Sequence, residues 1–95
     1  MGVTESVKEV VKWYRKAAEQ GVPDAQSNLG LMYKKGQGVI QDNLYAHMWL
    51  NIVTSNGNAT VIKNRDIVAM KMTKEYLAEA HKLARECVKK NYKGC

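Results

Sequence analysis

Apolar residues recur at steps of three and four along the first part of the chain, which is the spacing of the buried face of an amphipathic helix. The members of this stripe are Val7, Val10, Val11, Tyr14, Ala17 and Ala18. Thr4 precedes the stripe at the distance of an N-cap, and Gly21 follows it as a residue that readily ends a helix in the left-handed conformation. The pattern therefore predicts a first helix that runs from just after Thr4 to just before Gly21.

A second helical pattern follows at once. Pro23 suits the first position of a helix, and Asp24 stands in the first turn, where a negative charge is favourable. The apolar face of this second segment consists of Ala25, Leu29, Met32 and Tyr33. Gly36 and Gly38 then end the helix in a loop. Because the connection at Gly21 is only about two residues long, the two helices are expected to form an antiparallel hairpin over about residues 5–35.

Three more helices are predicted in the rest of the chain. Asp42 or Asn43 can cap a third helix, which the Asn56-Gly57-Asn58 sequence brings to a stop. Its apolar positions are Tyr45, Met48, Trp49, Ile52 and Val53. A fourth helix is expected over about residues 61–72, and Thr73 can cap a fifth over about residues 74–90. We therefore expect an all-α protein.

The hydrophobic pattern repeats after 36 residues. This shift aligns Trp13 with Trp49 and Gly21 with Gly57, and it keeps small apolar positions in step. A period of 20–50 residues is typical of stacked helical units that cannot bury their apolar faces alone. The pattern predicts a short α/α solenoid of two antiparallel helical hairpins, closed by a C-terminal helix.

The residues at the repeated positions resemble the Sel-1-like repeat, a relative of the tetratricopeptide repeat. The positions that carry the resemblance are Trp13, Tyr14, Ala17, Gly21, Ala25, Leu29, Gly30, Tyr33, Gly36 and Gly38 in one full repeat, and Trp49 and Gly57 in a second. Small residues at such positions let helix backbones approach closely, while Trp13 and Tyr33 are expected to fill the space between hairpins. Trp49 shares the position of Trp13, so we expect both tryptophans in the core.

The resemblance implies a single repeat domain over residues 1–95. A first repeat would span about residues 6–41, a second about 42–72, and a closing helix with its tail about 73–95. The fourth helix lacks the Leu-Gly-x-x-Tyr pattern of the first repeat, so the second repeat looks degenerate. The segment from Asn64 to Cys95 is similar to the C-terminal part of some bacterial Sel-1-like proteins, many of which are exported.

Composition and charge leave this picture unchanged but add an alternative function. The chain has 95 residues, 45% of them hydrophobic and 25% charged, which is ordinary for a globular domain. No apolar run is long enough to span a membrane. The net charge of +6 is concentrated in the second half, which suits an anionic partner such as nucleic acid or an acidic surface. Twelve of the fifteen basic residues are scattered lysines, so a solvated helix face is the simpler interpretation and nucleic acid is not the expected partner.

Cys87 and Cys95 are the two cysteines of the chain. Their spacing fits neither a zinc site nor a redox C-x-x-C pair, and Gly94 allows the chain to turn back after the last helix. We expect them to form a disulfide that pins the tail to this helix. The localisation is open: periplasmic or secreted if this pair is oxidised and an export signal was removed, and otherwise cytoplasmic.

No group of residues points to catalysis. His47 and His81 stand in different helices, and single histidines there are usually surface or packing residues. The Ser-x-x-Lys motif of β-lactamases is missing, because the serines are followed three positions later by Glu9, Gly30 and Asn58. A hydrolase of that kind remains an alternative by family label only. We expect a protein that is not an enzyme and has no cofactor or metal site.

The remaining expectation is a binding surface for another protein or peptide. A helical solenoid exposes equivalent positions of successive hairpins on its concave wall. If the first helix of each hairpin lines that wall, its residues are Lys12, Arg15, Lys16 and Glu19 from one hairpin and His47, Met48, Asn51 and Ser55 from the next. Two hairpins make a small groove, which favours weak or avidity-assisted binding; the sequence does not predict the oligomeric state.

Overall fold

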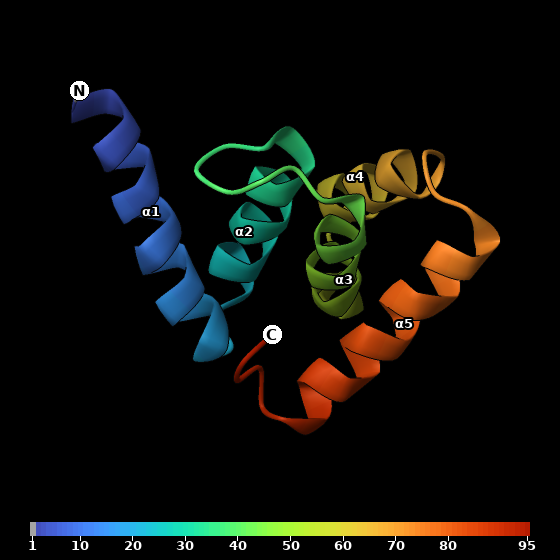
Figure 1. Ribbon diagram of the computed structural model, residues 1–95. Coiled ribbons are helices and arrows are strands. Elements are labelled where there is room, and N and C mark those ends of the chain that lie inside the picture. The colour runs from blue at the N-terminus through green and yellow to red at the C-terminus, as the bar shows by residue number, and fades with distance from the viewer. Residues whose placement is uncertain (1) are drawn as a thin grey trace.

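The computed structural model describes residues 2–95, which form five α-helices and one short 3-10 helix (Figure 1). The elements are α1 (Gly2–Glu19), α2 (Pro23–Lys35), α3 (Asn43–Val53), η1 (Thr54–Asn56), α4 (Ala59–Ala69) and α5 (Lys74–Lys89). No strand occurs among these residues. The predicted all-α fold is confirmed.

Side-chain caps set the start of three helices. The carboxylate of Asp42 accepts hydrogen bonds from the first backbone N–H groups of α3, and the side chain of Asn58 does the same for α4. The hydroxyl of Thr73 accepts one from the N–H of Tyr76 at the start of α5. These bonds satisfy backbone donors that have no partner within the helix. The predicted starts at Asp42 and Thr73 are confirmed.

Two helix boundaries differ from the sequence-based prediction. The first helix begins at Gly2, so Thr4 lies within its first turn and is not its cap. The fourth helix covers Ala59–Ala69 instead of about residues 61–72, because Asn58 starts it earlier. At its other end the chain leaves the helix at Met70 and reaches Thr73 in the extended conformation that an N-cap requires.

The glycines at the turns have the predicted backbone conformation. Gly21 ends α1 with φ of 83°, and Gly57 ends η1 with φ of 75°, both in the left-handed region that disfavours a side chain. Gly30 acts differently, because it lies within α2 at the contact with α3. A Cβ atom there would lie 2.9 Å from Cγ of Leu50, so the missing side chain lets the two helices approach closely.

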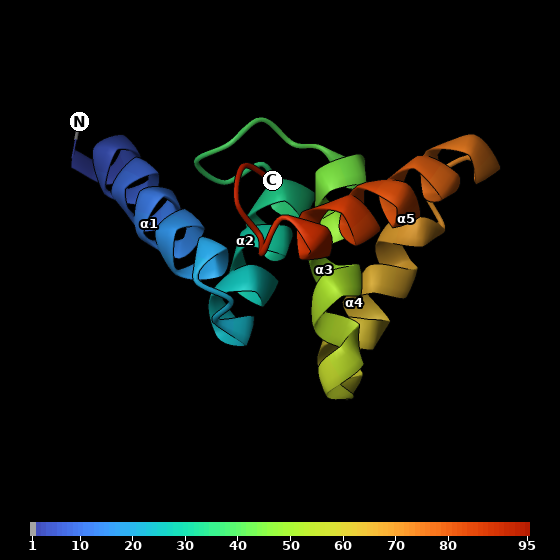
Figure 2. The same ribbon diagram turned by 90° about the horizontal axis from the view of Figure 1, so that it is seen from below.

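Helix α3 is the centre of the packing. It contacts α2 on one side and both α4 and α5 on others, whereas α1 packs against α2 (Figures 1 and 2). In both views the C-terminus lies between α1 and α5. The largest fully buried side chains are Leu29, Met48, Trp49, Leu50, Val68 and Cys87. The helices thus form the predicted solenoid, with the tail turned back toward the first hairpin.

The expectation that Trp13 fills the space between hairpins is wrong. Its side chain is 65% exposed, while Trp49 at the equivalent repeat position is fully buried. Tyr33 is half-buried at the contact of α2 and α3, where its ring lies 5.6 Å from that of Tyr45. The tyrosine therefore fills this junction, as predicted, and the tryptophan of the first repeat does not.

Candidate functional site

A hollow on the surface lies between α3 and α5. Its volume is about 560 Å³. From α3 and the following turn it is lined by Asn51, Ile52 and Ser55, and from α5 and the tail by His81, Ala84, Arg85, Val88 and Tyr92. We call this hollow the α3–α5 groove. Its lining combines apolar and polar side chains, which is the usual character of a binding site.

Asn51 is held in one orientation in the lining of the α3–α5 groove. Nη1 of Arg65 donates to its Oδ1 at 3.3 Å, and its Nδ2 lies 3.3 Å from Nδ1 of His81. Because a guanidinium can only donate, Oδ1 is the acceptor and Nδ2 the donor. Nδ1 of His81 must then accept, which leaves the proton of the neutral ring on Nε2. The network thus defines the tautomer of an exposed histidine in the groove.

Arg65 organises this network from α4. Its guanidinium also pairs with Asp66 at 3.0 Å and lies 3.5 Å from the hydroxyl of Thr54. The ion pair is partly exposed, so it contributes little to stability by itself. Its effect on the site is to orient the amide of Asn51.

His47 lies beneath the network and is 2% exposed. Its ring meets the ring of His81 edge-on, with 5.3 Å between the centroids. Among the described residues, Nδ1 of His47 finds no hydrogen-bond partner. Burial lowers the pKa of His47 from 6.5 to about 4, and the neighbouring His81 and Arg65 act in the same direction. At neutral pH His47 is therefore an uncharged packing residue, not a surface group.

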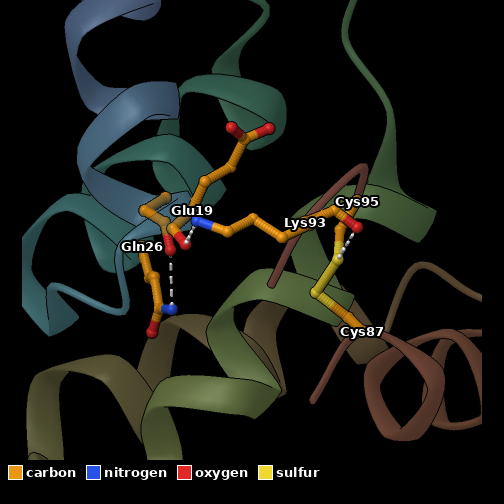
Figure 3. The surroundings of a disulfide bond; sticks show 6 residues. Glu19, Gln26, Cys87, Lys93 and Cys95 are labelled. Carbon is orange, nitrogen blue, oxygen red and sulfur yellow. Dashed lines mark hydrogen bonds between the residues drawn. A yellow bond between two sulfur atoms is a disulfide. The ribbon is translucent and has the colours of Figure 1, made fainter. Parts of the chain in front are cut away.

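The C-terminal tail forms one end of the α3–α5 groove. Cys87 and Cys95 are joined by the predicted disulfide, and Nζ of Lys93 donates to the backbone oxygen of Glu19 at 2.8 Å (Figure 3). The backbone N–H of Tyr92 donates to the oxygen of Cys87 at 2.8 Å. The ring of Tyr92 also lies against Gly21, so that the tail links α5 to the end of α1. Tyr92 is thus fixed from both sides.

Only part of the expected binding wall is found at this groove. Asn51 and Ser55 line it, as the sequence suggested for α3. His47 and Met48 do not, because they are 2% and 1% exposed beneath the packed helices. Their assignment to a binding surface is corrected: α5 and the tail pack over this part of α3 and take its apolar face into the core.

The four expected residues of α1 lie elsewhere. Arg15 donates to the hydroxyl of Tyr33 at 2.8 Å, which directs it toward α2. Nζ of Lys16 lies 5.4 Å from the centre of the Trp13 ring, and Lys12 is exposed. Glu19 contributes its backbone oxygen to the bond with Lys93. The structure therefore does not bring the α1 and α3 sets into one groove.

Three polar residues of the groove, His81, Arg85 and Tyr92, were not predicted as site residues. His81 and Arg85 are four residues apart on α5, a spacing that places them on one helix face and was readable from the sequence. The sequence did not show which element faces these two side chains, because that depends on how α5 packs on α3.

Among the side chains that the structure describes, those of residues 7–95, no three His, Cys, Asp or Glu gather where they could hold a metal ion. None of the helices described combines the length and the apolar character needed to cross a membrane.

Comparisons with known proteins identify the family and the fold of the chain. The Sel1 repeat family matches residues 8–22 and 23–58. Among solved structures, a protective antigen present in uropathogenic Escherichia coli strains, displaying an SLR fold, is similar with a TM-score of 0.82 and 32% identity. The match covers 90% of this chain and 20% of that antigen, so the chain spans a fifth of its length. A search of the curated proteins finds no match.

Proposed function

This chain belongs to the Sel1 repeat family, and from this premise we propose that it binds a partner polypeptide in the α3–α5 groove. Sel1 repeats are generally protein–protein interaction modules, and proteins with this fold are typically scaffolds without enzymatic activity. The choice of groove and of a polypeptide partner is our proposal.

One observation carries this proposal: the α3–α5 groove is an open hollow of about 560 Å³ between the second hairpin and the closing helix α5. Ile52, Ala84 and Val88 offer it apolar surface, while Asn51 is already oriented by Arg65. Helical solenoids present binding surfaces where such neighbouring units meet. A hollow of this size admits a few side chains, so a short segment of the partner would bind here with modest affinity.

Asn51 and Ser55 are the part of the sequence-predicted wall that this proposal keeps. The basic second half of the chain offers an alternative, in which exposed lysines of α5 such as Lys82 and Lys89 bind an anionic surface. That alternative predicts a steep loss of affinity with salt for nucleic acid and no dependence on the groove.

The proposal can be tested with peptides selected from a random display library on the folded, oxidised protein. Titration of ¹⁵N-labelled protein with a selected peptide should shift the backbone amides of Asn51, Ser55, Ala84 and Val88. Ser55→Trp should fill the groove and abolish these shifts. The matched control is Lys35→Trp, at the exposed end of α2, which should leave the shifts unchanged. Failure to select any peptide, or shifts confined to α1, would overturn the proposed site.

A further inference from the structure

The α3–α5 groove presents hydrogen-bond donors and a cation without an acidic side chain. His81 and Arg85 both line it from one face of α5. Arg85 is exposed and, within the part of the chain that the structure describes, makes no ion pair or side-chain hydrogen bond. The nearby Arg65 is different, because Asp66 already pairs with it at 3.0 Å. Arg85 is therefore the cation that the fold leaves available.

The second donor follows from the Asn51 network. Nδ1 of His81 accepts from the amide of Asn51, so its Nε2–H is the group that can donate to a ligand. Asn51 is in turn anchored by Arg65 on α4, which limits the ring positions open to His81. The groove thus offers a preset imidazole N–H one helical turn from a free guanidinium.

None of the acidic residues of α5 is among the residues that line this groove. Glu86 lines a separate, smaller hollow of about 170 Å³, together with Tyr45 and Lys90. The two hollows therefore differ in charge: the smaller one contains a carboxylate, while the α3–α5 groove has only neutral and basic lining residues. An anionic group would find complementary charge in the latter and no carboxylate there to repel it.

Resting on the proposed function, we infer that the segment bound in the α3–α5 groove is acidic and aliphatic. A side-chain carboxylate of the partner accepts hydrogen bonds from Arg85 and from Nε2–H of His81. A neighbouring aliphatic side chain packs on Ile52 and Val88, with Tyr92 closing one end. Charge-assisted hydrogen bonds are the stronger kind, and the apolar lining residues add burial that a simple anion would not use.

The experiment compares each selected groove-binding peptide with its Glu→Gln or Asp→Asn analogue on the full oxidised chain. We expect selected peptides to contain an acidic residue next to an aliphatic one. The neutral analogue should bind about tenfold more weakly, the magnitude expected for a lost charge-assisted hydrogen bond. Arg85→Gln should remove this difference, whereas Lys82→Gln should preserve it, because Lys82 lies on the same helix and does not line the groove.

The outcomes separate this inference from the proposed function. Peptides that shift the groove amides but bind equally well as neutral analogues would overturn the acidic partner and leave the binding groove in place. Retention of the tenfold difference in Arg85→Gln would also overturn the inference. Loss of the tenfold difference in Arg85→Gln would support the inference, provided that the melting temperature of this variant is unchanged and that Lys82→Gln keeps the difference.

Discussion

Trp13 and Trp49 stand 36 residues apart at the same repeat position, yet the first is 65% exposed and the second is fully buried. The difference lies in what packs around their helices. Helix α3 contacts α2, α4 and α5, so Trp49 is enclosed, whereas α1 has its contacts with α2. A shared repeat position therefore produces a shared environment only where the neighbouring helices are also shared.

Replacing each tryptophan by alanine should have very different effects. Trp49→Ala removes a large buried side chain and should cost about 3–5 kcal/mol of unfolding free energy, enough to unfold much of a domain of this size. Trp13→Ala should cost about 1 kcal/mol or less, because most of its ring is already in water. Urea denaturation measures both changes. Equal costs, or strong acrylamide quenching of Trp49 in the native protein, would contradict the assigned burial.

Gly30→Ala should lower stability although it improves helix propensity. Propensity alone would favour alanine by about 1 kcal/mol. The added methyl group would lie 2.9 Å from Cγ of Leu50 and 3.3 Å from the backbone oxygen of Ala46, so α2 and α3 would have to separate. Overpacking of this kind costs about 1–3 kcal/mol. Chemical denaturation should show a net loss; a stabilised variant would mean that the two helices adjust without cost.

Gly57→Ala tests backbone strain without a steric clash, and is therefore compared with Gly30→Ala. A Cβ atom at Gly57 would meet nothing within 4 Å, but its φ of 75° disfavours a side chain. We expect a loss of about 1 kcal/mol from backbone strain alone. A variant as stable as the wild type would show that this turn can adopt another conformation.

The stability of the protein should fall as the pH drops below 6.5. The pKa of His47 is about 4 in the folded state, below its ordinary value of 6.5, so the unfolded chain takes up a proton first. The contribution of neutral His47 to the free energy of unfolding is complete above pH 6.5 and is lost as the pH falls toward 4. Between pH 7 and pH 5 the loss should be about 2 kcal/mol.

His47→Leu separates this effect from the titration of other groups. Its stability should change less than that of the wild type between the same two pH values, because the titrating ring is gone. In the wild type, the midpoint of the His47 ring signal in an NMR titration should lie near 4. A midpoint near 6.5 would show that the ring is accessible to water and would remove the basis of the prediction.

Reduction of the Cys87–Cys95 disulfide should loosen the tail and lower the melting temperature. A short closed loop of this kind stabilises a protein by about 2–3 kcal/mol in the chain-entropy model. The double variant Cys87→Ser/Cys95→Ser should have the melting temperature of the wild type without its disulfide, whether or not a reductant is present. Hydrogen exchange should accelerate at the N–H of Tyr92, which donates to the oxygen of Cys87. An unchanged melting temperature on reduction would mean that Tyr92 and Lys93 hold the tail without the disulfide.

The sequence by itself determined where most helices begin and end, because those signals are local. The caps at Asp42 and Thr73, and the left-handed turns at Gly21 and Gly57, act on backbone groups within a few residues of themselves. The 36-residue period likewise predicted the solenoid, since each helical unit must bury its apolar face against the next. The pairing of Cys87 with Cys95 belongs to the same class, because both lie in one short segment.

Only the tertiary structure decided which faces of these helices meet water. His47 and Met48 were expected on an exposed wall, yet both are buried: Met48 lies in the core cluster with Ala84 and Cys87 of α5, and the ring of His47 packs against that of His81. Arg85 becomes a groove residue for the same reason, through its position opposite Asn51 and Ser55. Burial and charge complementarity depend on contacts between segments far apart in the sequence, as in the bond from Asn51 to His81 across 30 residues, and periodicity within one helix carries no information about them.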